Sequence, residues 1–433
     1  MSPNYFGAFH LRISSLYTCG CDDCKDKVTG FNLSLGDSFK QLLTAGKEAL
    51  KRLHEIGSYK PQDLKNEKVY QDLINQTFDI FNFAITDNDM PDVMRTALEN
   101  DAFLFGGLKA HAQLFEASKL LLDDNGNLKP FKQLSNEFDK LNLTYNKNYL
   151  EAEYEFAVGS SQMAAKWSEF SNNDNYYLQY RTAGDNRVRD EHAALNGTTL
   201  PKSDSFWSSY IPPNGWNCRC TVVEVLKDKY PISDSSKSIT AGEKATTQIG
   251  KDGKNRLKIF RFNPGVQKVV FPPAHPYGKV KGAKEAKPII LTIFNNQAAE
   301  ELKALRKAKD TEIKNWASTK IKKGRHLTIT GEQFKTPEVR VSKSNIESLL
   351  KHISNVDDKE AVRDIEKIIK SAKYSSSKEL EKKGSKNYGS KVSRGVESYN
   401  YYHSKWNDMD VEINMEVMKN GYEQPYAILF NKK

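Results

Sequence analysis

The sequence predicts an α+β protein of several domains. Apolar residues recur at helical spacing through residues 1–170, short alternating stretches follow in residues 171–232, and residues 288–433 run from helical patterns to alternating strands. Residues 233–287 lie between the last two regions: 233–254 are rich in Ser, Gly and Lys with few apolar anchors, 256–259 alternate briefly as a short ordered piece, and 279–287 are rich in Lys. We therefore expect a helical N-terminal region, a small Cys/His-containing α+β domain, a basic linker and a C-terminal α+β domain.

Helical periodicity accounts for most of the N-terminal region. The predicted helices cover residues 38–56, 69–83, 91–122 and 143–170. The third begins at Pro91, and proline suits the first position of a helix because the N–H that it lacks has no partner there.

The next region has the texture of strands and loops. Residues 176–181 and 220–225 read as strands, since aromatic and β-branched side chains dominate both. Gly, Asn, Pro and Trp crowd the stretch between them, which is typical of loops.

The C-terminal region is predicted to end in an antiparallel meander. The expected elements are a strand at 288–293, helices at 297–322, 344–353 and 359–372, a loop at 373–393, and strands at 396–403, 410–417 and 426–430. Lys419-Asn420-Gly421 is a hairpin signal between the last two strands.

Composition excludes several classes of protein. The chain is 38% hydrophobic and 11% aromatic, which is too aromatic for a disordered chain. No apolar run approaches the ~20 residues of a membrane-spanning helix, so we expect no membrane association. The N-terminus shows no signal-peptide pattern, and five cysteines are too few for a disulfide scaffold, so we expect a cytoplasmic protein.

The net charge of +10 is unevenly distributed. Residues 1–224 carry 23 Lys+Arg against 30 Asp+Glu, residues 225–287 carry 14 against 5, and residues 288–433 carry 28 against 20. A polyanionic partner would therefore be met by the last two regions, which hold the whole positive excess.

A His/Cys constellation lies between residues 181 and 220. Cys218 and Cys220 are two positions apart, so on a strand both thiolates point to one face and could bind one metal ion. His192 is the third predicted ligand and a carboxylate the fourth, for a structural zinc. Two alternatives stay open: the thiols are buried or form a disulfide, or thiols from Cys19-Gly20-Cys21-Asp22-Asp23-Cys24 complete the site.

The same stretch resembles the head-morphogenesis domain of Mu-F-like phage minor head proteins. The matching residues are Arg187, His192, Leu195, Gly197, Phe206, Trp207, Pro212, Pro213, Gly215, Trp216, Cys218, Arg219 and Cys220. The resemblance implies a minor capsid protein that acts in head morphogenesis and in DNA packaging or ejection. It implies portal and capsid proteins and DNA as partners, and a location in the bacterial host cytoplasm during assembly and then in the virion.

The C-terminal region resembles, in its order of elements, the phage-associated branch of the barnase, EndoU, colicin and RelE-like ribonuclease superfamily. The resemblance is carried by residues 339–342 leading into 346–352, and by 399–405, 410–414 and 426–429. It implies an endoribonuclease that needs no metal or other cofactor, and a partner immunity protein.

Metal-free RNA cleavage needs groups that move protons and cations that hold the phosphate. The predicted catalytic residues are His352, His403, Tyr401 and Lys405, and the predicted RNA-binding residues are Lys343, Arg394 and Tyr402. Strand alternation places Tyr401, His403 and Lys405 on one face of the sheet and Tyr402 and Ser404 on the other.

Two readings of other classes compete with a ribonuclease, so enzymatic activity stays open. The basic C-terminal region could bind packaged DNA without chemistry, which would make the protein purely structural. A zinc hydrolase is less favoured, because the chain has no His-Glu-x-x-His spacing. For the individual residues the alternative to catalysis is structural: the tyrosines would form half of a core, Lys405 would be solvated and His352 would lie at a rim.

Overall fold

The structure is a computed structural model that describes residues 36–380 and 388–431. It confirms the α+β class with more than one domain, since the chain divides into one compact unit up to Asn296 and another from Gln297. No helix in the described ranges is both long enough and apolar enough to cross a membrane.

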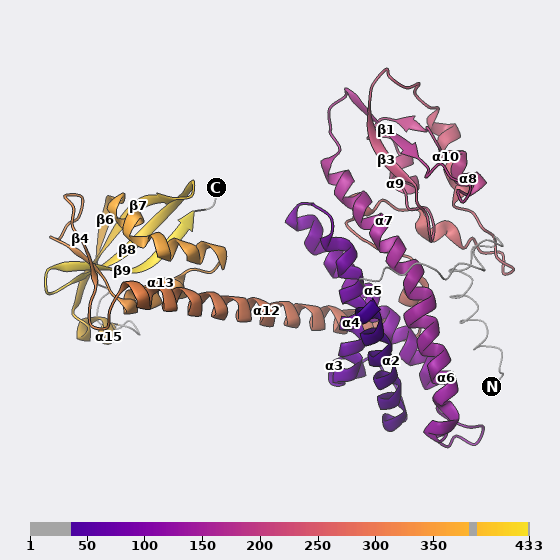
Figure 1. Ribbon diagram of the computed structural model, residues 1–433, viewed down its shortest axis with the longest axis horizontal. Coiled ribbons are helices and arrows are strands. Elements are labelled where there is room, and N and C mark those ends of the chain that lie inside the picture. Colours follow the sequence, from indigo (N-terminus) through magenta and orange to yellow (C-terminus); the bar gives the residue numbers. More distant parts are fainter. Residues whose placement is uncertain (1–35, 381–387, 432–433) are drawn as a thin grey trace. The chain divides into compact units, whose positions relative to one another are not determined.

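The first unit is built on a layer of helices (Figure 1). Its leading elements are α2 (Gly36–Ile56), α3 (Asp63–Asn66), α4 (Lys68–Thr86), α5 (Asp92–Ser118), α6 (Phe131–Leu143), the π-helical turn η3 (Thr144–Tyr149) and α7 (Leu150–Glu169). Helix α4 packs against α2, α5 and α7. The four predicted helices are confirmed, whereas α6 was not predicted, because it buries only one narrow face, through Leu134, Phe138 and Leu141.

A small antiparallel sheet follows α7. It consists of β1 (Tyr176–Arg181), β2 (Thr199–Leu200) and β3 (Thr221–Leu226) in the order β2-β1-β3, with the short helices α8 (Asp190–Ala193) and α9 (Phe206–Tyr210) in its connections. Both predicted strands are confirmed. Trp207, Tyr180 and Val222 are fully buried in its core together with Met163 and Phe170 from the end of the α7 region.

The prediction that residues 233–287 form a linker is wrong. They form α10 (Ser235–Ala245), η4 (Leu257–Phe260), α11 (Pro264–Gln267) and η5 (Pro276–Lys279). Aromatic side chains spaced far apart along the segment supply the missing anchors, since Phe260, Phe271 and Tyr277 are buried in the core of the helical layer. The Phe271 ring stacks on Phe105 with 3.7 Å between centroids, which fixes the segment onto α5.

The predicted strand at 288–293 is also wrong, because these residues belong to the long helix α12 (Ala283–Lys320). Ala286, Ile290 and Ile293 recur at helical spacing and are buried. The contact that selects the helix is a close approach to α5, where a Cβ on Gly107 would lie 2.5 Å from Cγ2 of Ile290.

The second unit contains a six-stranded sheet. Its strands are β4 (Leu327–Ile329), β5 (Val339–Val341), β6 (Lys373–Glu379), β7 (Val396–Trp406), β8 (Met409–Met418) and β9 (Tyr422–Asn431), in the order β4-β5-β9-β8-β7-β6. Only the β5–β9 pair is parallel. The meander of β7, β8 and β9 confirms the predicted strands, whereas β6 lies where a loop was predicted, since its residues are all exposed and polar or aromatic.

Helices cover one face of this sheet. They are α13 (Lys343–His352), the 3₁₀ segment η6 (Asp357–Asp364) and α14 (Ile365–Lys370), with the end of α12. Helix α13 begins with a capping box, in which Ser342 and Asn345 satisfy each other's backbone amides. A smaller apolar cluster around Val396, Tyr399 and Met418 lies on the opposite face, next to the short helix α15 (Tyr388–Ser393).

Candidate metal and sheet-face sites

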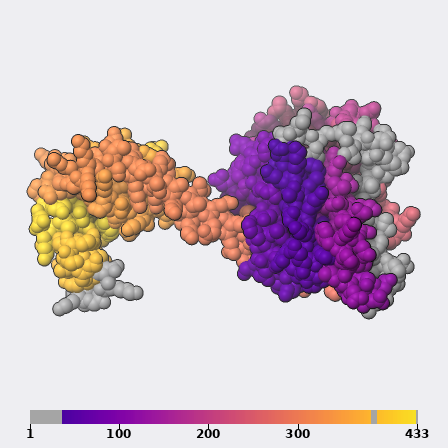
Figure 2. Space-filling view, turned by 60° about the horizontal axis from the view of Figure 1, so that its bottom comes forward, coloured from indigo at the N-terminus to yellow at the C-terminus, as the bar shows by residue number. Residues whose placement is uncertain are grey.

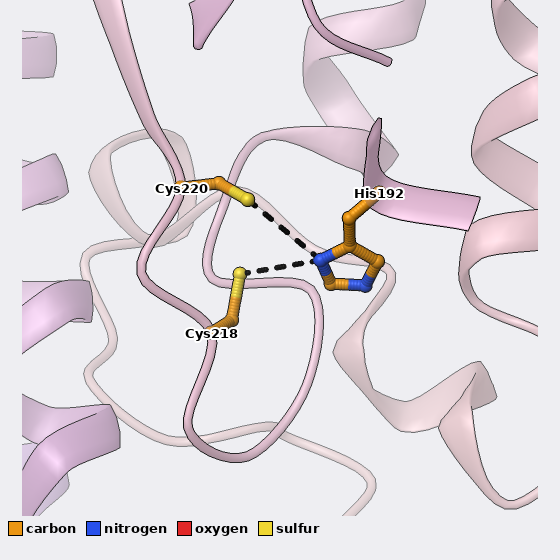
Figure 3. Close-up of side chains that lie close together, drawn as sticks. All are labelled: His192, Cys218 and Cys220. Atoms are coloured by element: carbon orange, nitrogen blue, oxygen red, sulfur yellow. Dashed lines mark hydrogen bonds between the residues drawn. The ribbon is translucent and has the colours of Figure 1, made fainter. Parts of the chain in front are cut away.

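Three predicted metal ligands converge beside the small sheet. His192 lies on α8 and is 2% exposed, and Cys218 and Cys220 lie just before β3. The thiol sulfurs of Cys218 and Cys220 lie 3.6 and 3.7 Å from Nδ1 of His192 (Figure 3). The three ligand atoms all lie within 4.8 Å of one another.

These distances suit a tetrahedral metal ion. With Zn–S of about 2.3 Å and Zn–N of about 2.0 Å, sulfur and nitrogen ligands of one zinc lie about 3.5 Å apart. The observed separations from Nδ1 agree with that value. Nε2 of His192 is buried and has no hydrogen-bond partner within the described part of the chain, so Nδ1 is the ring nitrogen directed at the thiols.

The thiols are electrostatically unequal. A hydrogen bond from Cys220 holds the pKa of the Cys218 thiol well below its usual range, and His192 acts in the same direction. The same contact with Cys218, together with burial, raises the pKa of Cys220. Of the two thiols, Cys218 is therefore the one that ionises more readily.

The loop that carries the thiols is braced from both sides. Arg189 donates from Nη2 to the carbonyl oxygen of Trp216 at 2.6 Å, and Arg219 forms a bidentate ion pair with Asp185 at 2.5 and 2.7 Å. The indole of Trp216 packs edge-on against Phe156 on α7, at 5.0 Å between centroids. These contacts hold the ligands in place before any ion binds.

The other motif residues serve this local architecture. Trp207 is fully buried and donates from Nε1 to the carbonyl of Pro201 at 3.0 Å. Gly197 has φ +82°, which favours glycine, and a Cβ on Gly215 would lie 3.1 Å from Nη1 of Arg189. Arg187 is exposed, and its Nη2 lies 3.6 Å from Asp185.

Sequence reasoning missed Arg189 as the brace of the loop. The motif of the resembled family contains the nearby Arg187, whereas Arg189 is the arginine that reaches the Trp216 carbonyl. No carboxylate joins the three ligands in the described residues, so the predicted acidic fourth ligand is not found there. Cys19, Cys21 and Cys24 lie outside the described residues.

The residues proposed for RNA cleavage lie on the second sheet and α13. Tyr401, His403 and Lys405 share one face of β7, whereas Tyr402 lies in the core beneath the opposite face, as alternation predicted. His403 and Lys405 are exposed and Tyr401 is half-buried. His403 stands opposite Glu412 on β8, and Lys405 Nζ lies 3.9 Å from a carboxylate oxygen of Asp410.

His352 lies apart from His403 along the chain and in its contacts. It is exposed at the end of α13, and its ring meets the edge of Tyr426 at 5.9 Å. Lys343 begins the same helix and is half-buried. No hydrogen bond or ring contact joins His352 to His403 within the described ranges, so a concerted role for both depends on the substrate spanning them.

The prediction that Tyr402 stacks on an RNA base is wrong. Its ring is fully buried, because this face of β7 packs against α14 and Phe334, and its hydroxyl donates to Glu423 at 3.0 Å. Arg394 is half-exposed, but its guanidinium forms a bidentate pair with Glu416, which is 3% exposed.

Sequence reasoning missed Glu416 as the anchor of this face. It accepts hydrogen bonds from Arg394 and from Gln424, at 2.7 to 3.2 Å. The signal was present, since Asp410, Glu412, Asn414 and Glu416 place a polar side chain at every second position of β8.

Comparison with known proteins shows which part of the chain is similar to a known family. Residues 127–223 match the family of Phage Mu protein F like proteins. This Mu F-like segment runs from just before α6 into β3 and contains all three residues of the His/Cys cluster. It begins well before the predicted boundary at residue 171, because α6 and α7 belong to it.

Two curated proteins are similar to the chain over short stretches. Putative capsid assembly protein F of Escherichia phage Mu is 50% identical over 46 residues, and the Mu-like prophage FluMu F protein of Haemophilus influenzae is 32% identical over 88 residues. These stretches are 11% and 19% of this chain and 10% and 21% of the relatives. No solved structure matches the chain. The family match stops at residue 223, so the ribonuclease resemblance of residues 288–433 stays a prediction.

Proposed function

We propose that this protein is a phage or prophage minor head protein that acts in head morphogenesis and in DNA packaging or ejection. The observation that carries the proposal is the Mu F-like segment, in which the ordered motif residues converge on one braced His/Cys cluster. One of its relatives bears the name capsid assembly protein. The protein would fold in the bacterial host cytoplasm, join portal and capsid proteins, and remain in the virion.

A genetic experiment tests this role. In a phage or prophage that encodes the protein, deletion of the gene should abolish filled, infectious heads, and the wild-type gene supplied in trans should restore them. Purified virions should contain the protein by mass spectrometry. Normal numbers of filled heads in the deletion strain would overturn the proposal.

We propose further that His192, Cys218 and Cys220 bind a structural Zn²⁺. A bound zinc would tie α8 to the segment just before β3 by coordination of Nδ1 and two thiolates, and the contacts of Arg189 and Arg219 hold that segment in place. The sulfur-to-nitrogen separations support this reading over a purely apolar role for the thiols.

Metal content measured on the purified full chain tests the zinc site. We expect about one zinc per chain in the wild type. We expect its loss in Cys218→Ser, and its retention in Arg187→Ala, which alters an exposed side chain near the loop. Equal zinc content in wild type and Cys218→Ser would refute the assignment, and the buried-thiol alternative would then hold.

A second function is favoured by the exposed face of β7. We propose that the C-terminal domain is a metal-independent endoribonuclease, in which His403 and His352 exchange protons with the RNA, Lys405, Lys343 and Arg394 neutralise phosphate, and Tyr401 supports an unpaired base. Support comes from the exposed His403 and Lys405 on one face and from the positive excess of residues 288–433. An immunity protein would then protect the host.

RNA digestion by the full chain in EDTA tests this proposal. Wild type should cut single-stranded RNA, His403→Ala should lose most of the activity, and His326→Ala should keep it, because His326 is exposed just before β4, which three strands separate from β7 in the sheet. Intact RNA with wild type, or equal cutting by His403→Ala, would overturn it. Salt-sensitive DNA binding without cutting would favour the structural alternative.

A further inference from the structure

The middle of α12 carries large apolar side chains that are exposed. Residues 298–308 are all exposed, and Leu302 and Leu305 are 42% and 60% exposed. Atoms in the orange of residues near 300 lie at the surface in Figure 2. Leu291, about two turns before this stretch, is 37% exposed. A helix segment exposed on every side has little tertiary packing to support it, so leucines on it indicate a missing partner.

The exposed apolar residues have the spacing of a coiled coil. Leu291, Asn295, Ala298, Leu302 and Leu305 follow one another at intervals of four, three, four and three residues. That spacing puts Leu291, Ala298 and Leu305 at d positions and Asn295 and Leu302 at a positions of a heptad repeat. A polar Asn at a single a position is a feature that specifies register and a two-stranded state.

Charged residues flank this row of a and d residues, called here the α12 stripe, and they indicate which helix it pairs with and whether the two helices run parallel. In the same heptads Glu301 takes a g position and Arg306 takes the following e position, and neither forms an ion pair with a residue that the structure describes. In a parallel pair of identical helices, Glu301 of each copy faces Arg306 of the other. In an antiparallel pair, like charges would face one another, which is unfavourable.

We propose that α12 pairs with α12 of a second copy of this chain as a parallel, in-register, two-stranded coiled coil. The stripe buries Leu302 and Leu305 against their counterparts, and two symmetric Glu301–Arg306 pairs close its flanks. A second copy is the occupant that fits, because the stripe supplies both members of the charge pair and is therefore complementary to itself. This inference does not depend on the head-assembly or ribonuclease proposals.

Sedimentation of the full chain tests the interface. Wild type should be a dimer that dissociates on dilution. Leu302→Glu should raise the dimer dissociation constant by about tenfold or more, since it replaces a buried leucine contact by a charge. Ala304→Glu, which puts the same side chain on the far side of the helix, should leave the constant unchanged, and circular dichroism should show both variants folded. A wild type that stays monomeric at every soluble concentration, or equal weakening by both variants, overturns the proposal.

A charge exchange tests the register. Glu301→Lys alone should weaken self-association, because Lys would face Arg306, and Arg306→Glu alone should weaken it in the same way. Mixed together, the two variants should form a heterodimer, because every facing pair is then of opposite charge. A mixture that pairs no better than either variant alone would show that the helices do not meet in the parallel register.

Discussion

The Mu F-like segment and the C-terminal sheet domain both carry residues singled out from sequence, and the structure treats them differently. In the segment, His192 and the two cysteines come from separate elements and still meet within 4.8 Å. In the sheet domain, His403 and Lys405 take the predicted face, while His352 makes its ring contact elsewhere, with Tyr426. An ordered motif with fixed spacing predicts which residues from separate elements meet, whereas strand alternation predicts only which face of the sheet a residue lies on.

The two units also differ in how deeply they bury a charged pair. In the first unit, Lys109 and Glu153 are 1% and 0% exposed and pair with each other inside the helical layer. In the second, Lys359 is 4% exposed but its partner Asp310 is 31% exposed. If the lysine is removed, the Glu153 carboxylate of the first pair stays buried, whereas the Asp310 carboxylate of the second pair remains in contact with water.

The largest effect is expected from Lys109→Met. Removal of the ammonium leaves the Glu153 carboxylate buried and without its cation, which should cost about 3–5 kcal/mol of unfolding free energy. Urea denaturation of the full chain measures the loss. The double variant Lys109→Met with Glu153→Gln should recover part of it, because the amide oxygen can still accept the hydroxyl of Tyr277. A single variant as stable as wild type would show that the pair is not buried as described.

A smaller, pH-dependent effect is expected at Asp101, which accepts hydrogen bonds from the amides of Val270 and Phe271. Burial raises the pKa of Asp101 to about 6, although these amides act in the opposite direction. Because the folded-state pKa lies above the usual 3.8, this group's contribution to stability is greatest below about pH 4 and is lost as pH rises to about 6. The full loss is about 3 kcal/mol at most.

Asp101→Asn should remove this pH dependence and keep the two amide contacts. The measurement is the difference in unfolding free energy between variant and wild type, taken at pH 4 and at pH 7. The difference is needed because burial also lowers the pKa of His275 to about 3, which reduces the stability of both proteins as pH falls and cancels between them. Asp124→Asn, in an exposed turn, is the control. A difference that does not change with pH would contradict the raised pKa.

The sequence predicted most elements whose signal is local. The helix at 38–56 and the strand at 176–181 follow from spacing within one element. The prediction for 233–287 was wrong because its few apolar residues, such as Phe271 and Tyr277, are buried by contacts with α5 and α7. Those helices lie more than a hundred residues earlier in the chain. Burial of Tyr402 was missed for the same reason, since strand alternation does not say which face the helices cover.

Lys359→Met tests the second buried lysine and should cost less than Lys109→Met. Its ammonium bonds to Asp310 and to the carbonyl of Leu350, so the variant loses both contacts, but Asp310 can turn to water. We expect a loss of about 1–2 kcal/mol in unfolding free energy. A loss equal to that of Lys109→Met would remove the contrast between the two units.

The smallest effect on stability is expected from Lys405→Ala. The side chain is 76% exposed and 3.9 Å from Asp410, so unfolding free energy should change by less than about 0.5 kcal/mol. If the β7 face holds RNA, affinity for single-stranded RNA should nevertheless fall, and the salt dependence of binding should decrease by about one phosphate contact. Lys419→Ala, exposed in the β8–β9 hairpin, should change neither quantity. Equal RNA affinity in both variants would mean that Lys405 is an ordinary solvated lysine and that alternation selected a face without a function.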